Sequence, residues 1–226
     1  MVIKDGAIFI ADSHYNSKQT ILFKLLEQIK SNQIKPSQIY LMGDIFDFLC
    51  QEIIYFKNLN FKIIELINSL SKDIEIIYFE GNHDFNLKNI FPNILTIPRE
   101  QQPVKFIQNK QTIALSHGDI FTPTGYNVFS TIFRSHLFLS FLNFIDINSF
   151  LSKRSEKKLK EKKICSKQKD FNIFIEKRIK NYNVDLIIEG HFHQGHLSSK
   201  YINIPSLCCD NNYMAYEDKV FKFKKV

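Results

Sequence analysis

Short apolar runs recur along the chain at the length of buried β-strands. They cover residues 7–11, 39–41, 74–79, 104–107, 112–115 and 186–188. Between the first three runs, apolar residues return at the spacing of amphipathic helices, over 17–30 with Ser17 as N-cap and over 52–70. This alternation of helix and strand predicts an α/β layered fold, and the short runs after Tyr201 predict a second sheet packed on the first.

Polar side chains that can bind cations follow five of these runs. The five groups are Asp12-Ser13-His14, Gly43-Asp44 with Asp47, Gly81-Asn82-His83-Asp84, His117-Gly118-Asp119 and Gly190-His191-Phe192-His193. Each group alone is typical of a turn after a strand. Because ligands collect at the carboxyl ends of strands in α/β sheets, the ordered set predicts one shared site. Divalent metal ions bind carboxylate, amide and imidazole groups, and Asp44 is the candidate for a carboxylate shared by two ions.

The composition limits the possible folds and partners. The chain has 226 residues and 44% hydrophobic content, enough to bury a sizeable core, and its net charge of +7 favours anionic partners. Its four cysteines, Cys50, Cys165, Cys208 and Cys209, show no CxxC spacing. We therefore expect neither a zinc knuckle nor a disulfide framework, and a reduced cytosolic chain is the simplest account. An acid and a Gly near the start stand where a signal peptide has its apolar core, so export by that route is not expected.

Residues 121–183 separate the fourth polar group from the fifth and have the composition of a helical insertion. From 126 to 150 large apolar residues dominate, which favours a packed or interfacial His136, but polar residues interrupt them too often for a membrane span. Residues 151–180 then hold twelve Lys or Arg against four Asp or Glu. An apolar surface beside a cationic one suits an amphiphile with acyl chains and a phosphate, or an anionic membrane. The alternative is a helical cap with an apolar core and solvated lysines.

The ordered set resembles the signature of the calcineurin-like metallophosphoesterases, from about residue 7 to about residue 205. The resemblance implies a four-layer αββα sandwich of two mixed sheets, in a single domain over 1–226 with an inserted helical cap. It also implies two divalent ions, with Mn²⁺ as the expected metal, that acidify a water for attack on phosphorus. The implied ligands are Asp12, His14, Asp44 and His193 for one ion, and Asp44, Asn82, His117 and His191 for the other.

The same resemblance implies roles for the remaining polar residues. His83 would face the leaving-group oxygen as general acid or charge stabiliser, with Asp84 orienting its ring. Asp47 and Asp119 would hold histidines and backbone in place. His196 lies just beyond the last group, where a surface or supporting position is expected.

Within the superfamily, the insertion together with the GDIFDF stretch at 43–48 and the GNxDF stretch at 81–85 is similar to the bacterial UDP-2,3-diacylglucosamine diphosphatases of lipid A biosynthesis. Those enzymes release UMP and 2,3-diacylglucosamine 1-phosphate at the cytoplasmic face of the inner membrane. The similarity implies a lipid-linked nucleotide diphosphate as substrate and peripheral contact with an anionic membrane. The chain departs from the best-known branch at His83, where that branch has Arg, and at Ser13, where it has Leu.

Contacts to such a substrate are expected from the insertion. The candidate residues are Tyr126, Arg134, Arg154 and Lys158. A phosphodiesterase or phosphatase for another nucleotide or nucleic acid is the alternative, and a non-catalytic metal-binding scaffold is a third reading that the intact ligand set disfavours. The cations lie beside a Phe-rich stretch and do not alternate with aromatic residues along a strand, so we expect no nucleic acid partner.

Overall fold

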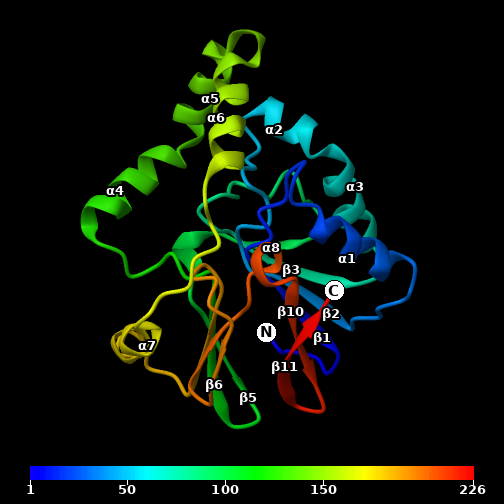
Figure 1. Ribbon diagram of the computed structural model, residues 1–226, viewed down its shortest axis with the longest axis vertical. Coiled ribbons are helices and arrows are strands. Elements are labelled where there is room, and N and C mark those ends of the chain that lie inside the picture. Colours follow the sequence, from blue (N-terminus) through cyan, green and yellow to red (C-terminus); the bar gives the residue numbers. More distant parts are fainter.

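The computed structural model describes residues 1–226 and contains two mixed β-sheets (Figure 1). The first sheet has the strand order β11-β10-β1-β2-β3-β4. Strands β1 to β4 run parallel to one another, whereas β10 is antiparallel to both β1 and β11. The bounds are β1 Ala7–Ile10, β2 Gln38–Leu41, β3 Glu75–Phe79, β4 Leu95–Ile97, β10 Asn212–Glu217 and β11 Val220–Lys225.

The second sheet has the order β5-β6-β7-β9-β8, in which β6, β7 and β9 are parallel and the two edge strands are antiparallel. The bounds are β5 Val104–Gln108, β6 Gln111–Ser116, β7 Leu186–Glu189, β8 His196–Leu197 and β9 Tyr201–Asn203. All six apolar runs of the sequence form strands, each within one residue of the predicted limits. Among these six, β1, β2 and β7 are buried along their whole length and are the strands whose runs are continuously apolar, as expected for parallel strands covered on both faces.

Apolar side chains fill the space between the sheets and cover both outer faces. Between the sheets, the rings of Phe9 and Tyr40 stack 4.4 Å apart in a core that includes Leu115 of the second sheet. Helices α1 (Ile21–Lys30) and α3 (Phe61–Leu70) pack on the outer face of the first sheet, and α7 (Phe171–Ile179) packs on the second. The layers therefore follow the order helix, sheet, sheet, helix, and the predicted fold is confirmed. Two short helices, Arg99–Gln101 and α8 (Leu207–Asp210), lie in the connections.

Two predicted helices have different limits in the structure. Helix α1 begins at Ile21 and not after Ser17, because Asn16 accepts hydrogen bonds from the two backbone N–H groups that follow Ser17 and closes a turn there. The range 52–70 forms two helices, α2 (Ile54–Leu59) and α3. Asn60 separates them, and its side-chain amide donates to the carbonyl of Phe56 at 2.9 Å.

Three helices project from the sandwich and form what we call the cap (Figure 1). The cap comprises α4 (Thr124–Phe133), α5 (His136–Ile145), the 3-10 turn Ile147–Ser149 and α6 (Phe150–Glu161). Leu139 is buried against Ile53 and Phe56 at the base, but Leu137 and Phe144 are 85% and 84% exposed. No single helix is long and apolar enough to cross a membrane. Helices α4 and α5 have the required length and composition only when taken together, and the pair is bent by 54°.

The predicted insertion at 121–183 contains both the cap and a helix of the sandwich. Helix α7 lies beside the second sheet in Figure 1, where Phe171 and Ile175 are buried. Of the two positions predicted for His136, the packed one is wrong, because the apolar stretch around it is itself largely exposed, and the interfacial one stays a prediction. The His136 side chain is 65% exposed and contacts Glu52. His196 lies on β8, with its ring 6.1 Å from that of Phe171.

Candidate metal centre

The five polar groups of the sequence meet at the carboxyl ends of β1, β2, β3, β6 and β7. Their nitrogen and oxygen atoms form two compact clusters, each within 4.8 Å. We call them the Asp12 group, which is Asp12, His14 and His193, and the Asp44 group, which is Asp44, His117 and His191. A third cluster of His14, Asp44 and His83 joins the two. The structure thus brings together six of the seven predicted ligands, and Asn82 Oδ1 lies 3.3 Å from His117 Nε2.

The backbone at these ligands is held in an unusual conformation. Five of the predicted ligands have left-handed φ angles between 41° and 65°, namely Asp12, His14, Asp44, His191 and His193. This region is sparsely occupied by residues with a side chain, and strain of this kind is concentrated at functional sites. Hydrogen bonds between the strand ends maintain it, from Asp12 N to Gly43 O at 3.1 Å and from His14 N to Asp44 O at 3.0 Å.

In the Asp12 group a buried carboxylate faces an imidazole. Asp12 Oδ1 lies 3.2 Å from His193 Nε2, and Asp12 Oδ2 accepts a hydrogen bond from His191 N at 2.8 Å. Burial raises the pKa of Asp12, but the charge and hydrogen bond of His193 outweigh it and leave the pKa below its usual value. The other ring nitrogen of His193 lies 3.1 Å from the carbonyl of Ile164. His193 Nε2 therefore points into the site.

In the Asp44 group a fully buried histidine faces the carboxylate that the two ions would share. His117 Nε2 lies 3.5 Å from Asp44 Oδ1, and His117 Nδ1 donates to the carbonyl of Met42 at 2.9 Å. Burial lowers the pKa of His117, but the negative charge of Asp44 more than reverses this and raises it to about 10. Burial and the neighbouring His117 lower the pKa of His191 to about 4. A Cβ at Gly43 would lie 2.4 Å from the His117 ring, so only glycine allows this approach.

His14 supplies a direct test of whether the site suits a metal ion. Both of its ring nitrogens are buried and have no hydrogen-bond partner, while the nearest carboxylate oxygens, on Asp47 and Asp44, are 3.5 and 3.9 Å away. Leaving a buried polar atom unpaired costs about 1–3 kcal/mol. A divalent cation would bind one of these two His14 nitrogens and neutralise the carboxylates. The mixture of imidazole, carboxylate and amide donors suits such ions. The residues present therefore fit the metal centre that the sequence predicts.

His83 lies beside both groups, but the group that orients its ring is not the predicted one. Its Nδ1 lies 2.6 Å from the carbonyl of Asp47, and its backbone N donates to Asp44 Oδ1 at 2.8 Å. Asp84 does not orient this ring, which corrects the role assigned to it. The Asp84 carboxylate instead accepts the N–H of Asp44 at 2.9 Å and the hydroxyl of Tyr78 at 2.7 Å. Burial and the charge of Asp44 raise the pKa of Asp84 to about 7.

The predicted supporting residues also differ from one another in their contacts. Asp47 contributes through its backbone carbonyl, which accepts from His83. Asp119 holds no histidine, because Arg99 donates to its carboxylate at 3.0 Å and to its carbonyl at 2.6 Å. Arg99 also donates to Asn127 on α4 at 2.8 Å. This arginine, which the sequence did not single out, links the His117 loop to the cap.

The four predicted substrate contacts lie at different distances from the metal centre. Lys158 lines a cavity that reaches Asn82 and His83. Arg134 donates to the carbonyl of Gly81 at 2.6 Å and lies over the ring of Phe85, so it fixes the 81–85 loop. The Tyr126 ring lies 6.0 Å from the guanidinium of Arg99. Arg154 is exposed on α6. None of these contacts is tested by the geometry, and all four stay predictions.

A buried charged network behind the second sheet was not foreseen. Arg178 of α7 pairs with Glu189 through hydrogen bonds of 2.7 and 3.1 Å and donates to the carbonyl of Gly118 at 2.8 Å. Glu189 immediately precedes the loop of His191, and Gly118 immediately follows His117. The network therefore fixes both loops of the Asp44 group. In the sequence Arg178 belongs to a run of cations that predicted a surface for anionic partners, with solvated lysines as the alternative.

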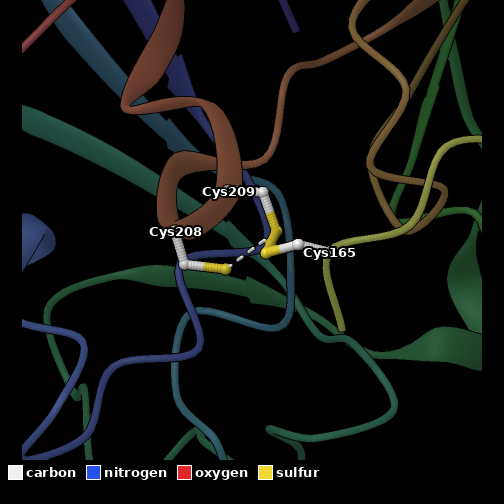
Figure 2. A group of neighbouring side chains, drawn as sticks. All are labelled: Cys165, Cys208 and Cys209. Carbon is white, nitrogen blue, oxygen red and sulfur yellow. Dashed lines mark hydrogen bonds between the residues drawn. A yellow bond between two sulfur atoms is a disulfide. The ribbon is translucent and has the colours of Figure 1, made fainter. Parts of the chain in front are cut away.

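The expectation that the cysteines form no disulfide is wrong. Cys165 and Cys209 form one across 44 residues, with their Cα atoms 5.4 Å apart (Figure 2). The partners lie in the segment after α6 and on α8, which only the folded chain brings together. The spacing of cysteines in the sequence contains no sign of this contact.

Comparisons with known proteins identify a family and several similar chains. The model of the calcineurin-like phosphoesterase family matches residues 7–195. The UDP-2,3-diacylglucosamine hydrolase of Histophilus somni (strain 129Pt) is 24% identical over 201 residues, covering 82% of this chain and 83% of that protein. The hydrolase of the same name from Wigglesworthia glossinidia brevipalpis is 26% identical and covers 83% of this chain and 79% of that protein. The Escherichia coli phosphoesterase Yfce superposes over 95% of this chain and 90% of its own, at 14% identity and a TM-score of 0.46.

Proposed function

The chain belongs to the calcineurin-like phosphoesterase family, and from that membership we propose that it hydrolyses the pyrophosphate bond of UDP-2,3-diacylglucosamine. The products would be UMP and 2,3-diacylglucosamine 1-phosphate, as in lipid A biosynthesis. The observation that carries the proposal is an apolar cavity between the cap and the sandwich that ends at Asn82 and His83. The names of the two relatives from Histophilus and Wigglesworthia support the same substrate.

The cavity has a volume of about 400 Å³ and one wall from each part of the molecule. The sandwich contributes Phe48, Ile53 and Phe56, and the cap contributes Phe133, Leu139, Leu142, Leu151 and Leu159. Burying a methylene group contributes about 0.8 kcal/mol, so an acyl chain would be stabilised strongly here. A phosphate next to Asn82 and His83 would then lie at the metal centre, with Lys158 at the margin of the cavity to attract its charge.

At the metal centre, the side chains have separate tasks. Two divalent ions, which we propose to be Mn²⁺, would supply charge neutralisation at phosphorus and an acidified water. The Asp12 group would hold one ion and the Asp44 group with Asn82 the other, with Asp44 shared between them. His83 would stabilise charge on the leaving oxygen, because the Asp47 carbonyl occupies its Nδ1 and leaves the Nε2 edge for the substrate.

We propose further that the cap contacts the cytoplasmic face of the bacterial inner membrane. Its exposed apolar side chains include Phe129, Leu137, Phe141, Phe144, Ile147 and Phe150. Helix α6 adds five Lys or Arg over 150–161. Apolar side chains that enter the interface and cations that attract anionic lipids act together in peripheral binding.

The activity is tested by incubating the full chain with UDP-2,3-diacylglucosamine and MnCl₂ and measuring release of UMP. We expect release that His117→Ala abolishes. If the wild type released no more UMP than His117→Ala, the proposal would be wrong. If it hydrolysed another nucleotide or DNA instead, the result would support the alternative, a phosphodiesterase or phosphatase for such a substrate.

The cavity is tested with Leu142→Ala and the matched control Leu137→Ala on the same helix. Leu142 lines the cavity, whereas Leu137 is 85% exposed. Loss of the Leu142 side chain removes about 2 kcal/mol of contact with an acyl chain, so kcat/KM for a soluble short-chain analogue should fall roughly 30-fold. Both variants should hydrolyse bis-p-nitrophenyl phosphate at the wild-type rate. Equal losses on both substrates would show that Leu142 serves only the core.

A further inference from the structure

Three of the four cysteines, Cys165, Cys208 and Cys209, lie close together (Figure 2), and Cys209 is next to the predicted metal ligand His193. Cys165 and Cys209 are joined by the disulfide, and the free Cys208 Sγ lies 3.5 Å from Cys209 Sγ. Cys209 Sγ is 3.8 Å from His193 Nδ1. The fourth, Cys50, is buried in the core under the cap. The cluster is therefore in direct contact with the Asp12 group.

The disulfide joins two segments that position different members of the Asp12 group. On one side, Ile164 precedes Cys165 and presents its carbonyl to His193 Nδ1 at 3.1 Å. On the other side, the backbone N–H of Cys208 on α8 donates to the carbonyl of Asp12 at 3.3 Å. Figure 2 shows α8 and the segment with Cys165 approaching each other from separate directions. The covalent bond thus couples the position of His193 to that of Asp12.

The Ile164 carbonyl has a specific effect on the chemistry of His193. When a ring nitrogen of histidine binds a metal, the other usually donates its proton to a carbonyl or carboxylate, which fixes the tautomer and the ring orientation. Here that contact leaves Nε2, 3.2 Å from Asp12 Oδ1, as the nitrogen that faces the site.

The other hydrogen bond to this carbonyl is local, from Ser166 N at 3.2 Å within the same segment. Residues 162–168 form neither helix nor strand. Apart from the disulfide, the segment is attached through Lys167, whose side chain is 53% exposed and contacts the carbonyl of His193 and Asp210. The Gln168 N–H and the Ser166 carbonyl also contact the Gln194 side chain.

We propose that Cys165 and Cys209 form a redox-sensitive site that sets how tightly the Asp12 group binds a divalent ion. A dithiol reductant would supply two electrons and two protons, its own sulfurs forming a disulfide while the Cys165–Cys209 bond breaks to give two thiols. The freed segment then no longer holds the Ile164 carbonyl on His193. Disulfides in reducing compartments are usually catalytic or redox-sensing. The inference rests on the proposed function only in that His193 is a metal ligand.

The test compares metal binding by the full chain in two oxidation states, without substrate. The metal-free protein is titrated with MnCl₂ by calorimetry, first as oxidised protein and then after reduction with dithiothreitol and desalting without oxygen. Alkylation and mass measurement should find two reactive cysteines in the denatured oxidised protein and four in the reduced one. We expect one of the two binding steps to weaken by about tenfold or more on reduction, the usual consequence of removing such a supporting contact.

Variants separate the pair from its neighbour. Cys165→Ser should bind as the reduced wild type does and should not respond to dithiothreitol. Cys208→Ser leaves the pair intact and should keep the full response. Identical binding curves for the two states of the wild type, four reactive cysteines after air oxidation, or loss of the response in Cys208→Ser would each overturn the proposal. If Cys165→Ser does not fold, the comparison of oxidised with reduced wild type decides the proposal alone. If the protein does not hydrolyse the lipid substrate, the proposed function fails but the effect of the disulfide on Mn²⁺ binding is unaffected.

Discussion

The Asp12 group and the Asp44 group stand next to each other but are supported in different ways. Behind the Asp44 group, Arg178 and Glu189 form an ion pair whose side chains are 6% and 0% exposed. Behind the Asp12 group, the support is a disulfide and a segment without regular structure. A buried network of fully paired groups changes only when the protein unfolds, whereas a disulfide can be broken in the folded state. One group is therefore permanently fixed and the other is open to adjustment.

The largest effect is expected where the two groups join. Asp44→Asn removes the carboxylate that lies within reach of ligands from both groups, so it should impair the two ions together. Loss of charge neutralisation worth about 4 kcal/mol corresponds to roughly a thousandfold in kcat. The measurement is turnover of bis-p-nitrophenyl phosphate together with the metal content after gel filtration.

His14→Gln is the matched control for Asp44→Asn. It removes a ligand of the Asp12 group and leaves the Asp44 group intact, so one ion should remain. If Asp44→Asn retained two ions per chain, the joining role of this carboxylate would be wrong.

The second effect concerns the buried support of the Asp44 group. Arg178→Met leaves Glu189 with a buried charge that no cation balances, and breaking such a pair lowers the free energy of unfolding by about 3–5 kcal/mol. Urea denaturation should show this loss in oxidised and reduced protein alike. Arg154→Met, at an exposed position of α6, should change little. A double variant Arg178→Met/Glu189→Gln should recover part of the stability, and a loss as large as in the single variant would argue against the ion pair as its cause.

The third effect is a dependence on pH that the metal-free protein should show, with His117 of the Asp44 group as its main source. Asp44 raises the pKa of His117 from 6.5 to about 10, so the folded state binds the proton more tightly than the unfolded state. The resulting stability is fully present below about pH 6.5 and is lost as the pH rises through about 10. Within this window, the contribution of His117 to the free energy of unfolding should fall by about 1.4 kcal/mol per pH unit.

Urea denaturation in EDTA from pH 7 to pH 10 measures this slope. A bound ion replaces the proton on His117, so the slope should disappear when MnCl₂ is present. A metal-free protein with constant stability across this range would show that His117 is not protonated by its contact with Asp44.

The same contrast explains how far the sequence alone could lead. The grouping of the Asp12 and Asp44 residues could be predicted because they are side chains of distinctive types at strand ends, and the apolar runs located those ends within one residue. The contacts of the Met42 and Ile164 carbonyls with histidines could not be predicted. Every residue has a carbonyl, and only the path of the folded chain decides which one contacts a histidine. The burial of Arg178 was hidden for a related reason. Its neighbours in the sequence are solvated cations, and only the position of α7 on the sheet turns this one inward.

The smallest effect should come from Lys167, the polar contact that accompanies the disulfide. Lys167→Ala removes donors to the carbonyl of His193, at 2.6 Å, and to Asp210, at 3.0 Å. Because the side chain is half-exposed and reaches His193 only through its backbone carbonyl, the affinity of the Asp12 group for Mn²⁺ should fall by less than about tenfold in oxidised protein. In reduced protein the loss should be larger, since the disulfide then no longer holds the segment. Lys169→Ala, two residues further along, is the matched control and should bind as wild type in both states. If Lys167→Ala lowered the affinity for Mn²⁺ equally before and after reduction, Lys167 and the disulfide would support the Asp12 group independently of each other.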